Sequence, residues 1–142
     1  MNHLEKRIFD IIAKPHLAGL ATVTEDGKPW VRYVIAQGAE DLTIRFSSFA
    51  NSRKVRQIKN NPEVHLNCGV TGLTDLHPYL QIQGKAEVVT TKDEKEKFWN
   101  EHLTKVFKGP DDPNYVVVIV KPYRIEYETP MTIEAPEIWI KE

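Results

Sequence analysis

The sequence predicts a mainly β protein, an antiparallel barrel or sandwich with a few flanking helices. Two observations support this fold class. Six or more stretches have the length and the alternating or continuous apolar character of strands, and hairpin turns join several of them. Helical spacing occurs only in short segments, which do not form repeated βαβ units with the strands. Because no repeat or linker is visible, residues 1–142 are expected to form a single domain.

The first part of the chain predicts one helix and three strands. Apolar residues recur at helical spacing over residues 4–12, and a proline follows shortly afterwards. Residues 17–24 and 29–37 are β-prone and flank the turn Asp26-Gly27, which predicts a hairpin. Apolar and polar residues alternate over residues 42–46, as in a half-buried strand.

The middle of the chain predicts a short helix between further strands. Residues 51–60 have helical spacing that a proline closes. Residues 64–68 and 79–89 are strand candidates. Gly84 lies inside the second of them, which predicts a bulge or a point of close backbone approach.

The last part predicts one more helix and the closing strands. Thr91 and Glu94 fit a capping box, and the apolar face of this helix continues to Phe107. An apolar run then covers residues 115–120, and Lys121-Pro122 is expected to interrupt it. The sequence alternates again over residues 123–128, and residues 138–140 form a short final strand.

Charge and cysteine content narrow the function classes. The chain has 19 basic and 20 acidic residues, whereas a general nucleic-acid binder usually has a basic excess. The single cysteine, Cys68, excludes a disulfide within the chain and argues against a thiolate metal site. The sequence shows neither a signal peptide at its start nor an apolar run of membrane-spanning length. A cytoplasmic protein without metal, membrane or nucleic-acid partners is therefore expected.

The helix predicted after residue 50 carries basic residues at its N-terminal end. Asn51 or Ser52 is a suitable N-cap, and Arg53, Lys54 and Arg56 crowd the first turn. Aligned peptide dipoles make this end positive, so each cation there is disfavoured by roughly 0.3–1 kcal/mol. A bound phosphate would explain the pattern, because free amides, a serine hydroxyl and basic side chains would converge on it. A solvated basic turn explains it about as well, and the local sequence leaves both open.

Three residues on neighbouring predicted strands add to this candidate anion site. Arg32 lies mid-strand among bulky apolar residues. An arginine there is either an exposed cross-strand partner or a ligand whose planar fork suits phosphate oxygens. Ser47 and Ser48 end the strand before the basic helix and offer hydroxyl donors without bulk.

In their order along the chain, these segments resemble the pyridoxamine 5'-phosphate oxidase-related family of FMN-binding split barrels, in particular its small general stress proteins. The resemblance implies a six-stranded antiparallel Greek-key split barrel with flanking helices. It covers nearly the whole chain and rests on the set of segments rather than on one motif. The segments are residues 20–23, 26–29, 32–34, 52–55, 61–62, 81–87 and 109–115.

The resemblance also implies a homodimer with two FMN molecules in clefts between the subunits. Arg32 would reach the phosphate from a strand that runs along the flavin. Tyr79 stands where the oxidases carry a flavin-contacting glutamine, and Trp139 would reach the flavin edge of the partner subunit. The implied cofactor-binding residues are Arg32, Tyr33, Val34, Ile35, Ser47, Ser48, Ser52, Arg53, Lys54, Tyr79 and Trp139.

The resemblance leads us to expect an FMN-dependent oxidoreductase of unknown substrate, with NAD(P)H or another small molecule as electron donor. Two alternatives stay open, a flavin-binding stress module without turnover and a related barrel that binds deazaflavin or haem. The oxidases extend into an arginine-rich C-terminal segment that binds the substrate phosphate, whereas this sequence ends at residues 139–142 without one. True pyridoxamine 5'-phosphate oxidase activity is therefore not expected.

Overall fold

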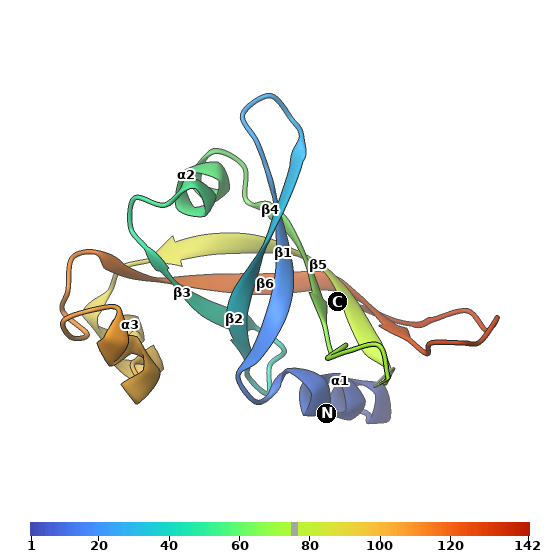
Figure 1. The fold of residues 1–142 in the computed structure, drawn as a ribbon. Helices are drawn as coiled ribbons and strands as arrows, with labels where there is room; N and C mark the ends of the chain where they lie inside the picture. The colour runs from blue at the N-terminus through green and yellow to red at the C-terminus, as the bar shows by residue number, and fades with distance from the viewer. Residues whose placement is uncertain (75–76) are drawn as a thin grey trace.

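The computed structural model describes residues 1–74 and 77–142, and within them the strands form one antiparallel sheet (Figure 1). The strand order is β3-β2-β1-β4-β5-β6-β7, and a further pairing of β3 with β6 closes β1 to β6 into a barrel. The mainly β split-barrel fold is thereby confirmed. The strands are β1 (His16–Val23), β2 (Pro29–Gly38), β3 (Ile44–Phe49), β4 (Glu63–Cys68), β5 (Tyr79–Val89), β6 (Tyr115–Glu128) and β7 (Glu137–Ile140).

The barrel is split between β2 and β3. These strands pair at Gln37 with Arg45 and at Gly38 with Ile44, and then diverge. From Ile44 to Phe49, β3 pairs instead with β6. The opening lies between the first half of β2 and the second half of β3, immediately before the chain enters α2.

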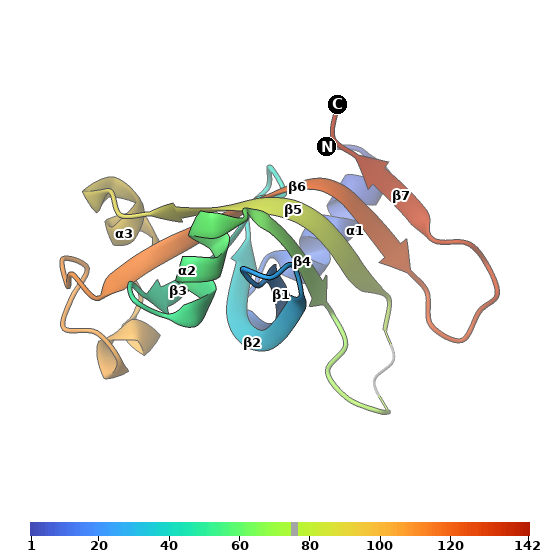
Figure 2. The ribbon, with the colours of Figure 1, turned by 90° about the horizontal axis from the view of Figure 1, so that it is seen from above.

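Three α-helices and a 3-10 helix flank the barrel in the described part of the chain: α1 (His3–Ile12), α2 (Arg53–Asn60), α3 (Lys92–Phe98) and η1 (Glu101–Lys105). Figure 1 shows α1 and α2 at opposite ends of the barrel, and Ile8, Ile12 and Ile58 insert from them into one core. In Figure 2, α1 lies beside β7, where Arg7 pairs with Glu137 at 2.7 Å. None of these helices is long and apolar enough to cross a membrane.

The prediction of one helix through Phe107 is wrong beyond residue 98. The chain turns at Trp99, whose φ and ψ are −58° and 135°, and η1 follows as a separate 3-10 helix. The Trp99 ring packs edge-on against Tyr115 at 5.5 Å between centroids. The Asn100 side chain then caps η1 by accepting from the amide of His102. The packing of Trp99 and the new cap at Asn100 therefore separate α3 from η1, although the apolar spacing predicted one continuous helix.

The predicted interruption at Lys121-Pro122 is also wrong, because β6 runs through it. The β5–β6 register shifts here, so that Gln83 lies opposite Arg124 while Gly84 lies opposite Pro122. Tyr123 is the extra residue of a β-bulge, which tolerates a proline that has no amide to donate. The bulge expected at Gly84 is thus confirmed.

Candidate functional site

Three basic side chains from β2 and α2 lie close together at the split of the barrel. Burial, and then the charge of Arg53, lowers the pKa of Arg32. Burial, and then the charge of Arg32, lowers the pKa of Lys54. Arg53 extends toward β2, where its guanidinium lies 5.4 Å from the ring centroid of Trp30. We call Arg32, Arg53 and Lys54 the cation cluster.

The cation cluster has no counter-ion in the described part of the chain. The ion pairs found in residues 1–74 and 77–142 involve other basic residues. Like charges held together raise the free energy of the site, and a bound anion would lower it. This arrangement favours an anion site over the solvated basic turn that the local sequence left open.

Arg32 is held in place by neutral partners. Its Nη1 donates to Thr22 Oγ1 at 2.6 Å and to the Trp30 carbonyl at 3.1 Å, and its Nη2 donates to Gln57 Oε1 at 3.0 Å. Thr22 and Gln57 are both buried. The guanidinium therefore ties β2 to β1 and α2 while its positive charge stays uncompensated.

Sequence reasoning missed Thr22 and Gln57. The sequence did carry one signal, because Thr22 shares the inward face of β1 with Ala18 and Leu20, where an apolar residue would be expected. A polar side chain on that face needs a buried partner. Gln57 gave no comparable signal, since it becomes that partner only when α2 packs onto the barrel.

Ser48 and Ser52 lie next to each other at the start of α2. Ser52 is the N-cap, and its hydroxyl oxygen accepts from the Val55 amide at 3.4 Å. The hydroxyl oxygen of Ser48 lies 2.8 Å from that of Ser52. The first turn of α2 contains no acidic residue. Two hydroxyls and the free amides of a helix start therefore adjoin the cation cluster, a donor set suited to phosphate.

Ser47 faces the other side of β3 and lines a hollow of about 230 Å³. Strands β2 and β3 form one wall, and α3 with the segment through η1 forms the other. Ile35, Phe98 and Leu103 make this hollow largely apolar, and Gln37 and Asn100 add amide groups. Because Ser47 and Ser48 are consecutive, the hollow and the donor set at α2 are adjacent along β3.

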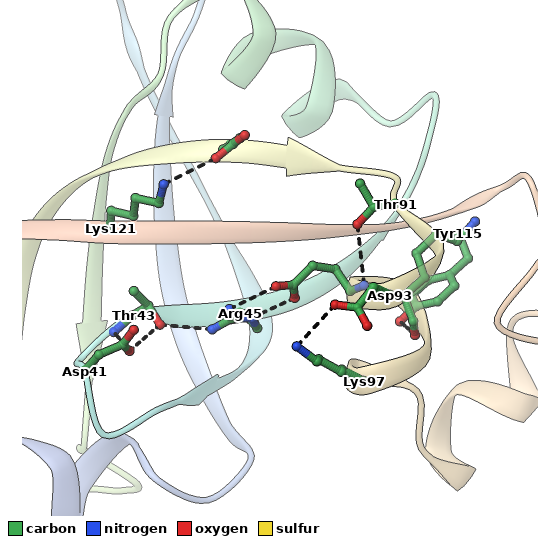
Figure 3. Close-up of polar contacts among 11 residues, drawn as sticks. Asp41, Thr43, Arg45, Thr91, Asp93, Lys97, Tyr115 and Lys121 are labelled. Atoms are coloured by element: carbon green, nitrogen blue, oxygen red, sulfur yellow. Dashed lines mark hydrogen bonds and ion pairs between the residues drawn. The ribbon is translucent and has the colours of Figure 1, made fainter.

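An ion pair connects α3 to β3 and so positions this wall. Figure 3 shows Arg45 extending from β3 toward α3, where its Nε donates to Glu94 Oε2 at 3.2 Å. Arg45 Nη1 also donates to Thr43 Oγ1 at 2.9 Å, and the Thr43 hydroxyl donates to Asp41 at 2.6 Å. Arg45 and Glu94 are both partly buried, which limits screening of the pair by solvent.

Apart from Val34, the side chains of the remaining predicted site residues lie on other faces of β2 and β3 or on other elements. Tyr33 and Ile35 project from the outer face of β2, whereas the Val34 side chain is buried in the core. Tyr79 and Tyr33 line a separate hollow of about 320 Å³. Trp139 packs near α1, and its indole nitrogen donates to Glu5 at 3.4 Å. Within one chain the structure thus brings together Arg32, Ser48, Ser52, Arg53 and Lys54.

Comparison with known proteins gives a consistent result. The family model described as pyridoxamine 5'-phosphate oxidase matches residues 4–128. General stress protein 26 of Bacillus subtilis is 31% identical over 138 residues, which cover 92% of this chain and 96% of that protein.

Solved structures agree with the sequence matches. General stress protein 26 from Bacillus anthracis superposes with a TM-score of 0.83 at 28% identity, covering 99% of this chain and 100% of that one. A pyridoxamine 5'-phosphate oxidase-related, FMN binding protein from Nostoc punctiforme has a TM-score of 0.63 at 15% identity, covering 87% and 78%. At that identity the second comparison supports the fold alone.

Proposed function

The chain belongs to the pyridoxamine 5'-phosphate oxidase family, and from this premise we propose that it binds FMN and acts as a flavin-dependent oxidoreductase. The observation that carries the proposal is the cation cluster without a counter-ion, beside two serine hydroxyls and the start of α2. A phosphate monoester supplies the negative charge that this site lacks. FMN carries such a phosphate, and riboflavin does not.

The residues present fit the rest of FMN as well. Arg53 and Lys54 would hold the phosphate, and the Ser48 and Ser52 hydroxyls would donate to it. The hollow beside Ser47 offers apolar walls for an aromatic ring, with the Gln37 and Asn100 amides for its polar edge. Bound FMN supplies the hydride or electron chemistry, while the chain binds, orients and shields it from water.

Reduction of the bound flavin tests the enzymatic part of the proposal. In an anaerobic titration of FMN-loaded protein with NADH and with NADPH, one donor is expected to bleach the flavin absorbance. An added electron acceptor should then restore it. If no donor of any class reduces the flavin, the protein is a flavin-binding module without turnover. A Soret band on haem addition, without uptake of FMN, would favour a haem-binding barrel instead.

An exposed apolar row supports a homodimer with the FMN cleft between its subunits. Leu17 on β1 and Val31, Tyr33 and Ile35 on β2 are 66%, 69%, 78% and 62% exposed. They share the outer face of the hairpin, because Leu17 pairs in register with Ile35. A contiguous apolar surface of this kind is characteristic of a protein interface. Ile35 also lines the hollow beside Ser47, so a second copy bound to this row would cover that hollow.

Tyr33→Asp is expected to weaken the dimer on the order of 100-fold, because the interface would bury an unpaired carboxylate. Sedimentation velocity over a concentration series measures the change. Val106→Asp is the matched control, since Val106 is an exposed apolar residue that lies after η1, outside the row. A wild-type protein that stays monomeric while it holds FMN would refute the interface.

A further inference from the structure

A large hollow in the described part of the chain lies next to the proposed flavin site, and the FMN placement proposed above does not fill it. Its volume is about 670 Å³, within the usual range of small-molecule pockets. The walls come from the end of α1, the start of β1, the middle of β2 and residues around the β4–β5 connection. Ile11, Leu17, Tyr33 and Val70 make the lining mostly apolar.

This hollow adjoins the one beside Ser47. Pro15 lines both of them. Tyr33 lines the large hollow and Ile35 the smaller one, and these two residues are neighbours on the outer face of β2. A ligand in the large hollow would therefore lie beside an FMN ring placed against Ile35.

His16, in the wall of the large hollow, has a buried nitrogen without a partner. Its Nδ1 lies 2.8 Å from the Lys14 carbonyl, which can only accept, so Nδ1 carries the proton. In the neutral ring Nε2 is then an acceptor. It is buried and has no hydrogen-bond partner within residues 1–74 and 77–142. A buried acceptor of this kind is an exception that calls for an explanation.

We propose that the large hollow is the substrate pocket of the flavin site, and that it takes a planar, mainly apolar ring bearing one hydrogen-bond donor. The donor, an O–H or N–H group, pairs with His16 Nε2. The substrate assignment rests on the proposed flavin function, whereas the pocket and its donor preference stand on the geometry alone.

Entry of the ring requires side chains around Nε2 to part, since water does not reach this atom. Once the ring is bound, the hydrogen bond forms away from bulk water, where competition from solvent is weak. The pocket should therefore distinguish a donor from a nondonor of the same shape.

Two naphthalenes provide matched probes. The hydroxyl of 2-naphthol donates a hydrogen bond, whereas 2-methoxynaphthalene has nearly the same ring surface and no donor. Equilibrium dialysis against flavin-free protein is expected to show about tenfold tighter binding of 2-naphthol. His16→Phe should abolish this preference and leave 2-methoxynaphthalene binding unchanged. His3→Phe, at an exposed position at the start of α1, should keep the preference.

A measurement on the unaltered protein covers the case in which His16→Phe does not fold. In ¹⁵N NMR of the imidazole rings, 2-naphthol should shift His16 Nε2 strongly and Nδ1 little. Equal affinity for the two probes, binding of neither, or an unmoved Nε2 resonance would overturn the pocket. Displacement of FMN by 2-naphthol would also overturn it, because the ring would then occupy the flavin hollow.

Quenching of flavin fluorescence, measured on the same samples, tests the proposed function separately. If the protein prefers 2-naphthol but does not quench FMN fluorescence, the pocket is supported and the flavin site is contradicted. If the protein quenches FMN fluorescence but binds both probes equally, the flavin site is supported and the pocket is contradicted. The two failures are thus distinguishable.

Discussion

Replacing Arg53 and Lys54 together by alanine is expected to weaken FMN binding on the order of 100-fold and to leave riboflavin binding nearly unchanged. Hydrogen bonds to a charged group contribute about 1.5 kcal/mol or more each, so two of them give about 3 kcal/mol. Riboflavin lacks the phosphate and makes neither bond. Titration of each flavin with protein, followed by fluorescence quenching, measures both affinities.

Arg56→Ala combined with Lys59→Ala is the matched control. It removes the same charge from the same helix, but neither residue belongs to the cation cluster. Arg56 donates instead to the Asn51 carbonyl at 2.7 Å. The control is expected to change FMN affinity less than about threefold, the effect of distant screened charges. Equal losses of FMN and riboflavin in the Arg53 and Lys54 variant would contradict the phosphate assignment.

Much of the fold could be predicted because most strands obey a local rule. Alternation between core and outer face is written directly into β2, where buried Val34 and Ala36 separate exposed Tyr33, Ile35 and Gln37. The start of α2 could also be predicted from the local sequence, since Ser52 caps it as expected. Both errors arose where distant contacts decided the local structure. Tyr115 anchors Trp99, and the β5 strand accommodates a proline inside β6.

The candidate site likewise has one part that the local sequence predicts and another that depends on distant contacts. The excess of positive charge at α2 was visible in the sequence because Arg53 and Lys54 are neighbours. The hydrogen bonds that hold Arg32 were not visible in the sequence, since Thr22 and Gln57 reach it from separate elements. Strand alternation places Ser47 and Ser48 on opposite faces of β3, but what each face meets became clear only when β3 was placed against β6. The FMN-binding roles of all these residues, and those of Tyr79 and Trp139, remain predictions.

Gly84→Val is expected to destabilise the fold by about 3 kcal/mol, the upper end of the cost of overpacking. A Cβ at Gly84 would lie 2.9 Å from the Lys121 carbonyl oxygen and 2.9 Å from Val120 Cγ1. The carbonyl belongs to the backbone of β6 beside the bulge, so it cannot rotate away as a flexible side chain would. Thermal unfolding should show a decrease in Tm of roughly 10 °C.

Gly72→Val separates this steric effect from the general effect of replacing a glycine. Among residues 1–74 and 77–142, nothing lies within 4 Å of a Cβ built at Gly72. Its substitution is expected to change the free energy of unfolding by less than about 0.5 kcal/mol, as at an unconstrained surface position. Gly84→Ala adds the Cβ alone and should fall between the two valine variants. If Gly84→Val unfolds at the wild-type temperature, β6 has room to shift at the bulge, and the close approach does not limit stability.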